Sequence, residues 1–394
     1  MDDPSKVAVK RVALLVETSR GFGRGLLHGI AHWMRERGAW STFVGESELD
    51  DQPPEWLGRS HFDGVISRHL PERLPAWAQD GRIPVVNLRD SSPKSDSPGI
   101  FPDDFLVGQM AADHLYDRGY RSFGFCGSPA HWSRRRRDGF QARVEGLGCQ
   151  LSVYEQRAEK AGPSLLNDRD EISRWVTSLP RPVGIMAAND PRGLQVLDAC
   201  HAVELRVPGE VGIVGVDDDT VFCELATPTL SSVRQDLETL GVTAAAILDA
   251  AMRGDPDSVR QRILVPPVSV AVRGSSDAFV IADEDVRKAL MLIRGQACRG
   301  ISIEEVASHT VLTRRTLERR FQRILGVTIH EEILRTKVEN ARRILVDEDL
   351  KLEVVATRCG FSSVPHLCKV FKEATGQRPG DFRRLQRRPS PTGR

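Results

Sequence analysis

The chain has 394 residues, of which 40% are hydrophobic and 6% aromatic, an ordinary balance for a soluble globular protein of two or three domains. Its formal net charge of +1 hides an asymmetry. Residues 1–285 carry 32 Lys and Arg against 42 Asp and Glu, a net charge of −10, whereas residues 286–394 carry 23 against 12, a net charge of +11. No apolar signal segment follows Met1, and no stretch approaches the roughly 18 apolar residues of a membrane span. We therefore expect a cytoplasmic protein, neither secreted nor membrane-spanning, whose basic end binds a polyanion.

The seven cysteines form no C-x-x-C pair and have no histidines at metal-binding spacing. This pattern is typical of reduced thiols used as small core residues. We expect no disulfide, no zinc and no cofactor.

The N-terminal part alternates between strand and helix patterns. A buried strand is expected over 10–17, then the loop TSRGFGRG and a helix through 26–33. The loop resembles a dinucleotide-binding fingerprint, but Leu26 stands where the third glycine belongs, so phosphate binding is disfavoured. The alternation continues with strands over 64–67, 85–88 and 123–126 and helices over 105–118 and 134–147.

The same rhythm repeats from Gln150. Strands are expected over 151–154, 183–188 and 211–216, and helices over 168–178, 191–202 and 237–252. The alternation predicts an α/β fold with doubly wound parallel sheets, arranged as two consecutive lobes of about 120 residues each within residues 1–274. Ligands of such sheets bind at the carboxyl ends of the strands, here in the crevice between the lobes.

Polar side chains gather at those predicted strand ends. Carboxylates and amides hydrogen-bond vicinal hydroxyls, arginine supplies several donors, and an aromatic ring covers the apolar face of a sugar. For any single residue of this set, the alternative to ligand binding is that its side chain caps a helix. Asn189 and Asp190, for example, precede Pro191, the pattern expected at a helix N-terminus. Taken together, the set predicts a sugar site whose candidate ligand-binding residues are Arg24, Asp104, Trp132, Arg134, Arg136, Asn189, Asp190, Asp217 and Gln235.

The basic end contains one helix-turn-helix pattern twice. Leu317, Phe321 and Gly326 recur as Leu367, Phe371 and Gly376, 50 residues later, and Val306-Ala307 recur as Val355-Ala356 after 49. A repeated supersecondary unit of this kind rarely arises by chance. Between the copies, a helix from Thr328 to Val346 would be about 27 Å long, the right scale to hold two readers in major grooves about 34 Å apart.

The second helix of each copy carries the candidate DNA contacts. In a helix-turn-helix unit this helix enters the major groove, where arginine reads guanine bidentately. For one copy alone, the alternative to DNA binding is a charged helix that merely faces solvent. The presence of two copies disfavours this alternative. The candidate DNA-binding residues are Thr313, Arg314, Arg315, Glu318 and Arg319 in the first copy and Ser363, Val364, Pro365, Cys368 and Lys369 in the second.

These residues, with the segments CGFSS and VFKEATGQRPGDFR, resemble the AraC/XylS family of bacterial transcription activators over about the last hundred residues. Val311 departs from the family, which has a glycine in the first turn. Because a β-branched residue tolerates positive φ poorly, we expect that turn to differ in geometry.

The segments HFDGVISR, PDDFLVGQMAADHLYDRGYRSFGFCG, GIMAANDPRGLQVLDAC, VGIVGVDDD and LSSVRQDLETLG resemble the periplasmic-binding-protein-type sensor of LacI/GalR repressors. By matching position, this resemblance implies ligand contacts from Asp104, Arg134 or Arg136, Asn189, Asp190, Asp217 and Gln235. This chain departs from that family in one respect: its DNA-binding segment follows the sensor instead of preceding it.

The combined resemblance implies a sugar-responsive regulator of a carbohydrate-utilisation operon. Its effector would be xylose or a related sugar, its partners operator DNA and RNA polymerase, and its assembly a homodimer; activation is the expected output. Residues 275–285 are the expected linker, 286–386 the DNA-binding domain and 387–394 a disordered tail. Two alternatives stay open: an α/β enzyme with an appended nucleic-acid-binding domain, and a constitutive DNA-binding protein with a degenerate sensor.

Overall fold

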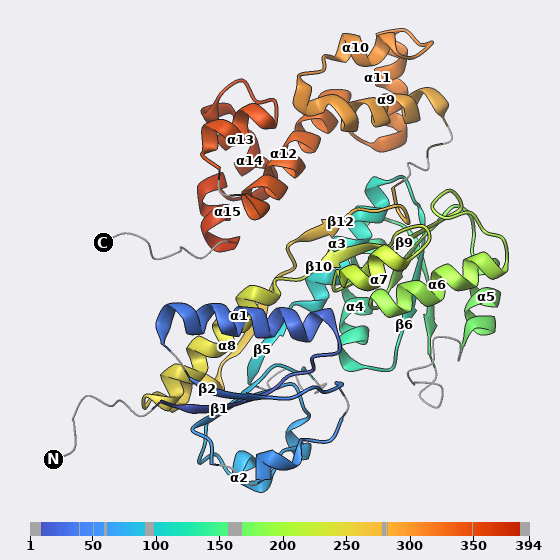
Figure 1. The fold of residues 1–394 in the computed structure, drawn as a ribbon. Coiled ribbons are helices and arrows are strands. Elements are labelled where there is room, and N and C mark those ends of the chain that lie inside the picture. The colour runs from blue at the N-terminus through green and yellow to red at the C-terminus, as the bar shows by residue number, and fades with distance from the viewer. Residues whose placement is uncertain are drawn as a thin grey trace. The chain divides into compact units, whose positions relative to one another are not determined.

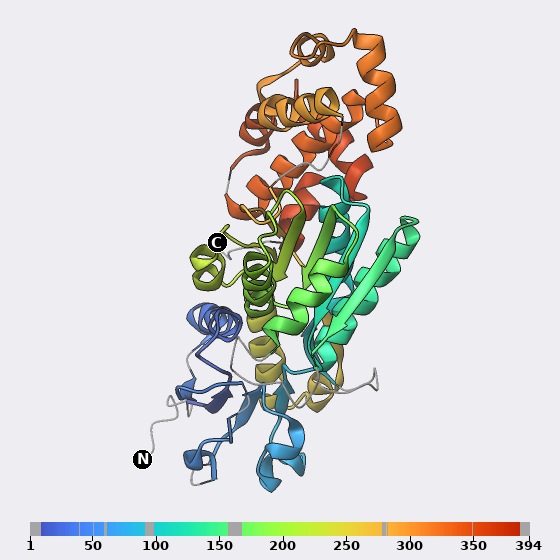
Figure 2. The same ribbon diagram turned by 90° about the vertical axis from the view of Figure 1, so that its right-hand side faces the viewer.

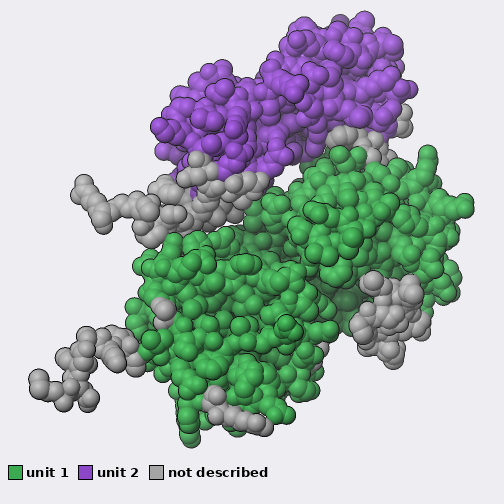
Figure 3. Space-filling view, in the orientation of Figure 1, with its two compact units in different colours: residues 1–278 green, residues 279–394 purple. Residues whose placement is uncertain are grey.

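The computed structural model describes residues 9–38, 40–49, 51–58, 61–90, 98–156, 168–277, 281, 283–348 and 350–386. The chain divides into two compact units, Met1–Ala278 and Phe279–Arg394, which Figure 3 colours separately. The first unit is α/β and the second is built of helices (Figure 1), which confirms the predicted fold class. In the described part of the chain, no helix is long and apolar enough to cross a membrane.

The first lobe of the α/β unit contains a parallel sheet in the order β2-β1-β3-β4. Its strands are β1 (Arg11–Leu15), β2 (Ser41–Val44), β3 (Gly64–Ser67) and β4 (Val85–Asn87). Successive residues of β1 enter different cores: Val12 and Leu14 pack with α1 (Gly21–Arg37) and α8 (Leu237–Met252), and Ala13 and Leu15 pack on the other face. Burial on both faces explains why this strand is continuously apolar.

The second lobe contains a six-stranded sheet in the order β12-β10-β9-β8-β6-β7, in which only β12 is antiparallel to its neighbour. Helices cover both faces of this sheet (Figure 2). The strands are β6 (Ser122–Gly127), β7 (Gln150–Glu155), β8 (Val183–Ala187), β9 (Val211–Val216), β10 (Ser231–Arg234) and β12 (Ser269–Ala271). The helices are α3 (Asp104–Asp117), α4 (His131–Gly146), α5 (Arg169–Ser178), α6 (Asp190–Ala202) and α7 (Thr220–Leu225).

The order of the lobes along the chain differs from the prediction. The elements expected over 105–147 lie in the second lobe, because β6 pairs with β8 in the six-stranded sheet. The helix expected over 237–252, α8, returns to pack against the first lobe. The prediction of two consecutive lobes was therefore wrong. Each element was recognisable from its own periodicity, but strand pairing depends on contacts between segments far apart in the chain.

A short parallel pair lies where the chain crosses between the lobes. It consists of β5 (Gly99–Pro102) and β11 (Arg262–Val265). These strands and β2, β10, β12 and α7 were not among the predicted elements. The remaining short elements of this unit are η1 (Glu55–Gly58), η2 (Pro71–Arg73), α2 (Ala76–Gln79) and η4 (Pro256–Arg260).

Glycines let two helix pairs pack in close backbone contact. A Cβ added to Gly241 of α8 would lie 2.2 Å from the carbonyl oxygen of Leu26 in α1. A Cβ added to Gly139 of α4 would lie 2.0 Å from the carbonyl oxygen of Phe105 in α3. Because both separations are shorter than any tolerable contact, a larger residue would push the helices apart.

The helical unit contains both predicted helix-turn-helix repeats. Its elements are α9 (Glu284–Gln296), η5 (Ala297–Arg299), α10 (Ile303–Ser308), α11 (Arg314–Leu325), α12 (Ile329–Asp347), α13 (Leu352–Arg358), α14 (Val364–Thr375) and α15 (Pro379–Gln386). Two separate hydrophobic cores form around the repeats. The connecting helix α12 contributes Ile329 and Ile333 to the first core and Val338 and Leu345 to the second, so it joins the two helix-turn-helix repeats.

The turns of the two repeats differ in backbone geometry, as expected from the valine at position 311. In the second repeat Gly360 has φ +70°, whereas Val311 is not among the described non-glycine residues with positive φ. Val311 is instead 91% exposed in a turn of the same length. The turn thus avoids the left-handed conformation that a β-branched residue disfavours.

The predicted linker is shorter in the structure than the expected 275–285. Ser275 and Ser276 are buried in the first unit, where the Ser275 hydroxyl accepts from the Ser231 N–H at 2.9 Å. On the other side, α9 begins at Glu284, capped by Asp283. The tail predicted to be disordered, 387–394, lies outside the described residues.

Candidate functional site

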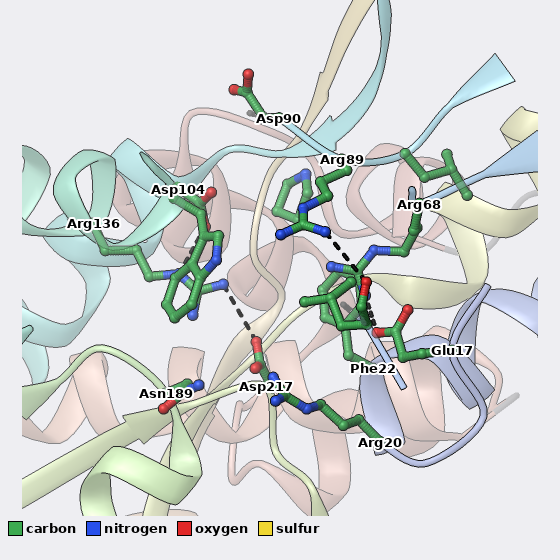
Figure 4. A pocket seen from close by; sticks show the side chains of 14 residues that line it. Glu17, Arg20, Phe22, Arg68, Arg89, Asp90, Asp104, Arg136, Asn189 and Asp217 are labelled. Atoms are coloured by element: carbon green, nitrogen blue, oxygen red, sulfur yellow. Dashed lines mark hydrogen bonds and ion pairs between the residues drawn. The ribbon is translucent and has the colours of Figure 1, made fainter. Parts of the chain in front are cut away.

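A pocket lies between the two lobes of the α/β unit, at the carboxyl ends of their strands (Figure 4). It encloses about 600 Å³ of non-protein space, part of which is open to solvent. The lining residues are Glu17, Arg20, Phe22, Leu49, Arg68, Leu88, Arg89, Asp90, Pro102, Asp104, Trp132, Arg136, Asn189 and Asp217. Five of the nine candidate ligand residues are among them: Asp104, Trp132, Arg136, Asn189 and Asp217.

Arg136 is the centre of the polar network on the second-lobe side of the pocket. Its Nε donates to Asp104 Oδ1 at 2.7 Å, its Nη2 to Asp217 Oδ1 at 3.3 Å and its Nη1 to the Ala188 carbonyl at 2.6 Å. Its Cζ lies 4.8 Å from the ring centroid of Trp132. The guanidinium is therefore fixed in one orientation, with a carboxylate on either side (Figure 4).

The two carboxylates carry shifted pKa values. Burial raises the pKa of Asp104 to about 6, against the opposing effect of Arg136. Burial also raises the pKa of Asp217, again opposed by Arg136 and by the hydrogen bond from Gln235. Burial alone would lower the pKa of Arg136, but these carboxylates outweigh it and the pKa is raised. The pocket thus holds an arginine cation between two carboxylates whose pKa values are both raised by burial.

Asp217 also adopts an unusual backbone conformation. Its φ is +104° and that of Asp218 is +52°, values that residues other than glycine rarely adopt. Backbone strain of this kind costs of order 1–3 kcal/mol and is concentrated at ligand-binding sites. The strain directs the Asp217 carboxylate toward the pocket, where Gln235 Nε2 donates to it at 2.5 Å.

On the first-lobe side, Glu17 and Arg68 form a buried ion pair. The Arg68 guanidinium lies over the ring of Phe22, 4.2 Å from its centroid, and burial lowers the Arg68 pKa. Glu17 is only 3% exposed, and its Oε2 is a buried acceptor with no hydrogen-bond partner in the described structure. A buried acceptor without a partner costs free energy.

Asn189 combines the two roles that the sequence left open. It is the N-cap of α6, where its Oδ1 accepts from the Arg192 N–H at 3.0 Å, and it also lines the pocket. Asp190 does not line the pocket. It is fully buried, and its carboxylate accepts from the Ser232 hydroxyl at 2.6 Å and the Asp219 N–H at 2.8 Å. Burial raises its pKa well above the ordinary value. Asp190 therefore supports the loop that presents Asp217.

Three further candidates also lie outside the pocket lining. Gln235 is behind Asp217 and positions it. Arg24 donates to the Thr18 carbonyl at 2.9 Å and lies 4.0 Å from the Asp219 carboxylate. Arg134 donates to the Pro129 carbonyl at 2.9 Å, so the structure resolves the choice between Arg134 and Arg136 in favour of Arg136 as the lining residue.

Several lining residues were missed in the sequence. Arg68 follows β3 directly, and Leu88, Arg89 and Asp90 follow β4. The rule that ligands bind at strand carboxyl ends would have selected them, had it been applied to these two strands. Arg20, Phe22, Leu49 and Pro102 are also new, as is Glu17, the last residue of the strand expected over 10–17.

The glycine-rich loop serves packing. A Cβ on Gly23 would lie 1.9 Å from the Glu17 carbonyl oxygen, so only glycine lets α1 start this close to β1. The Gly21 N–H donates to Asp219 Oδ2 at 2.8 Å, which joins the first lobe to the second.

The second site is on the helical unit, where α11 and α14 are built alike. Thr313 and Ser363 are their N-caps, accepting from the N–H groups of Thr316 at 3.4 Å and His366 at 3.3 Å. Gly326 and Gly376 end both helices, each with φ +75°. The predicted caps and stops thus define two helices of equal length in the reader position of each repeat.

The polar face of α11 has both paired and unpaired arginines. Arg314 donates to Glu318 at 3.0 Å and also pairs with Glu304. Arg315 and Arg319 are exposed and make no ion pair with any described residue. These two therefore have donors available for base edges, while Arg314 and Glu318 are engaged with each other.

The exposed face of α14 is less polar. Pro365 and Lys369 are exposed, and Val364 and Cys368 are half-buried. Among these four candidate residues, only Lys369 is a strong donor. All ten candidate DNA-binding residues thus lie at the starts or on the outer faces of α11 and α14.

Comparison with known proteins finds two domain families in the chain. Residues 112–276 match a periplasmic binding protein-like domain, and residues 306–385 match a helix-turn-helix domain. The first match lies within the α/β unit and the second within the helical unit.

Curated relatives align over nearly the whole chain. The xylose operon regulatory protein of Haemophilus influenzae is 28% identical over 95% of this chain and 98% of the relative. The protein of the same name from Escherichia coli strain K12 is 29% identical over 95% and 96%. The E. coli ribose operon repressor is 25% identical over 67% of this chain and 81% of its own length.

Solved structures agree. A structure described as the xylose-binding transcription activator xylR has 27% sequence identity and a TM-score of 0.61, covering 96% of this chain and 99% of that one. The chain is therefore a homologue of the xylose operon regulatory proteins, with a periplasmic-binding-protein-like sensor and a C-terminal helix-turn-helix domain. It is a DNA-binding transcription regulator, and the comparisons give no support to the enzyme alternative.

Proposed function

We propose that this chain is a cytoplasmic regulator of a carbohydrate-utilisation operon that binds xylose or a closely related sugar in the α/β unit and activates transcription from operator DNA. The names of the relatives that align over nearly the whole chain support both the sugar and the activating output. The pocket supports the sugar independently.

The observation that carries the proposal is the set of fixed polar groups around one small cavity. Asp104, Asp217 and Glu17 offer carboxylate acceptors, and Arg136 offers donors between two of them. Glu17 lines the pocket while paired with Arg68. Vicinal hydroxyls both donate and accept, so a monosaccharide matches this alternation of acceptors and donors.

Apolar groups in the same pocket match the apolar C–H faces of a sugar ring. Phe22, Leu88 and Trp132 line it beside the charged groups. The C–H faces of a pyranose ring pack against such surfaces, while its hydroxyls reach the polar groups at its edges. A pocket of this composition binds a neutral polyol better than an apolar metabolite.

For DNA, the connecting helix sets the geometry. α12 has 19 residues, which corresponds to about 28 Å at 1.5 Å per residue. Successive major grooves on one face of a duplex are roughly 34 Å apart. We propose that α11 and α14 enter adjacent grooves, with Arg315 and Arg319 reading bases and Lys369 anchoring a phosphate.

Regulation requires that the sugar favour one arrangement of the protein over another. The pocket lies between two lobes, so a sugar that contacts both favours their closed arrangement. We further propose a homodimer on repeated half-sites, acting together with RNA polymerase. Sedimentation velocity at micromolar concentration, with and without sugar and DNA, tests the dimer; a monomer under all conditions would exclude it.

Isothermal titration calorimetry with a panel of pentoses and hexoses tests the sensor, with each sugar compared with its enantiomer. We expect saturable binding of D-xylose or a close relative and none of its enantiomer. No heat from any sugar would instead favour a constitutive DNA-binding protein with a degenerate sensor. DNA binding is measured separately, by selection from a randomised operator library. A negative result for sugar binding then leaves the DNA-binding part of the proposal tested, and the reverse also holds.

A further inference from the structure

Ion pairs tie helix α11 to the two helices that precede it in the helical unit. Arg314 of α11 pairs with Glu304 of α10. Arg320 of α11 donates from Nη1 to Oδ2 of Asp283, the N-cap of α9, at 3.0 Å. Figure 1 shows α9 and α10 beside α11. The segment that matches the helix-turn-helix family, 306–385, contains neither of the two carboxylates.

The two arginines flank the buried stripe of α11 on opposite sides. Arg314 lies three residues before Leu317, and Arg320 lies three residues after it. Because successive residues of a helix are about 100° apart, these positions lie roughly 60° to either side of Leu317. Leu317 is fully buried, as is Phe321 one turn later. One ion pair therefore restrains α11 on each flank, and together they oppose rotation of the helix about its own axis.

Arg315 and Arg319 point away from this stripe. By the same geometry they lie about 160° from Leu317, and both are exposed. Bidentate reading of a base by arginine depends on the direction from which the guanidinium approaches. A rotation of α11 would change that direction, so the two ion pairs on its flanks set where Arg315 and Arg319 point.

The second repeat holds its helix by other means. In the 50-residue repeat, Arg314 and Arg320 correspond to Val364 and Val370 of α14. Both valines pack in the second hydrophobic core of the helical unit. Apolar contacts, which salt does not screen, therefore flank α14, whereas charges at the protein surface flank α11.

We propose that Arg314 and Arg320 are positioning residues, which hold α11 in the rotation that turns its exposed arginines toward DNA, and that Glu304 and Asp283 are their anchors. The inference rests on the proposed base-reading role of α11. It replaces the expectation that Arg314 itself contacts DNA. The Arg314–Glu304 side chains are 50% and 66% exposed and the Arg320–Asp283 side chains 38% and 16%, so each pair has a modest effect.

The anchors give the sharpest test, because a carboxylate repels phosphate and gains nothing from direct contact with DNA. In Asp283, Oδ1 caps α9 by accepting from the Val286 N–H at 3.2 Å, while Oδ2 faces Arg320. Asp283→Asn therefore keeps the cap and removes the ion pair, since asparagine caps a helix as well as aspartate does. Glu304→Ala removes the other anchor. We call these two proteins the anchor variants.

Glu284→Ala is the matched control. Glu284 lies in the same first turn of α9 as the Asp283 cap, and its ion pair, with Lys288 at 2.9 Å, stays within α9. Its removal changes the net charge by the same amount as each anchor variant. Any general gain in DNA affinity from losing one negative charge therefore appears in the control as well.

Selection of the full-length variants on a randomised operator library measures base preference. Arg319→Ala first identifies the base positions that α11 reads. Each anchor variant should reduce the preference at those positions by about two- to fivefold, the scale of one partly exposed ion pair, and leave the positions read by α14 unchanged. The control should change the preference at neither set.

A direct contact between Arg320 and a phosphate is the competing explanation. It predicts that Arg320→Ala lowers the salt slope of DNA binding by roughly one and leaves base preference unchanged. Positioning predicts that Arg320→Ala relaxes the same positions as Asp283→Asn, and that the double variant is no more relaxed than either single one. Fluorescence anisotropy at two salt concentrations measures the slope.

The proposal is overturned if both anchor variants keep the base preference of the control, or if Arg320→Ala changes the salt slope alone. If Arg319→Ala relaxes no base position, the base-reading role of α11 fails instead. Amide hydrogen exchange without DNA then decides the positioning role: faster exchange of α11 in the anchor variants than in the control supports it, and equal exchange overturns it.

Discussion

The backbone N–H of Gly21, at the start of α1 in the first lobe, donates to the Asp219 carboxylate of the second lobe at 2.8 Å. Arg24 lies 4.0 Å from the same carboxylate. Neither Gly21 nor Asp219 lines the pocket between the lobes, so this contact joins the lobes beside the pocket.

Asp219→Ala should therefore weaken sugar binding indirectly. A lost charge-assisted hydrogen bond between the lobes costs about 1–3 kcal/mol of the closed arrangement. Asp219→Asn is the comparison variant, since its one side-chain oxygen can still accept from the Gly21 N–H, although it cannot at the same time cap α7 as the other carboxylate oxygen of Asp219 does. Calorimetry should show weaker affinity for Asp219→Ala than for Asp219→Asn; equal affinities would show that the contact does not govern closure.

Sugar affinity should fall as the pH drops below about 6. Burial raises the pKa of Asp104 to about 6 in the sugar-free protein. Hydroxyl donors from a sugar favour the ionised carboxylate, so the sugar-bound pKa is lower and binding releases protons as the pH falls through 6. Affinity is then constant above this window and declines within it.

The same group has the opposite effect on the sugar-free fold. Because its folded pKa lies above its unfolded value, the folded state binds the proton more tightly, and this contribution to stability is lost as the pH rises through 6. Asp104→Asn should flatten both dependences. The pKa shift of Asp104 spans 3.8 to about 6, so calorimetry and thermal unfolding between about pH 3 and 7, roughly one unit either side of that range, compare the original chain with Asp104→Asn. Identical slopes in both proteins would exclude Asp104 as the titrating group.

Asp217→Ala and Asn189→Ala should each abolish measurable sugar binding while leaving the fold intact. Both side chains line the pocket, and a buried polar site that loses one partner loses about 1–3 kcal/mol or more. Circular dichroism checks the fold, and calorimetry checks binding. Arg134→Ala is the control, since its side chain lies outside the pocket lining. Unchanged affinity in both variants would remove these residues from the site.

The two reader helices should divide specificity and affinity between them. Arg319→Ala should cost about 1–3 kcal/mol on the cognate site and relax the preference at one base pair, because an exposed arginine reads guanine bidentately. Lys369→Ala should weaken binding to all sequences more evenly and lower the salt slope by roughly one. A randomised operator library at two salt concentrations measures both effects. A selective loss from Lys369→Ala together with a uniform loss from Arg319→Ala would reverse the assignment.

Much of the helical unit could be predicted from the sequence. Thr313, Thr328 and Gly326 mark the ends of their helices by their own chemistry, and the structure places a cap or a stop at each. The signals are local, because an N-cap satisfies an N–H two or three residues away and a C-terminal glycine adopts φ > 0 by itself. The 50-residue repeat adds the long-range information that one copy lacks.

In the α/β unit the sequence determined that Asp104, Asn189 and Asp217 stand at the ends of secondary-structure elements, and only the tertiary structure decided what each one faces. Asp190 is adjacent to Asn189 yet fully buried, and its carboxylate is hydrogen-bonded to Ser232 and Asp219. The two neighbours differ because successive side chains at the start of a helix point in different directions. Residues such as Arg68 and Arg136 meet across the pocket because α3 and α4 pair with the second lobe and α8 returns to the first. These pairings join segments that are distant in the chain: Ser122 of β6 pairs with Val183 of β8, and Gly241 of α8 packs against Leu26 of α1. Periodicity within one segment does not encode such contacts.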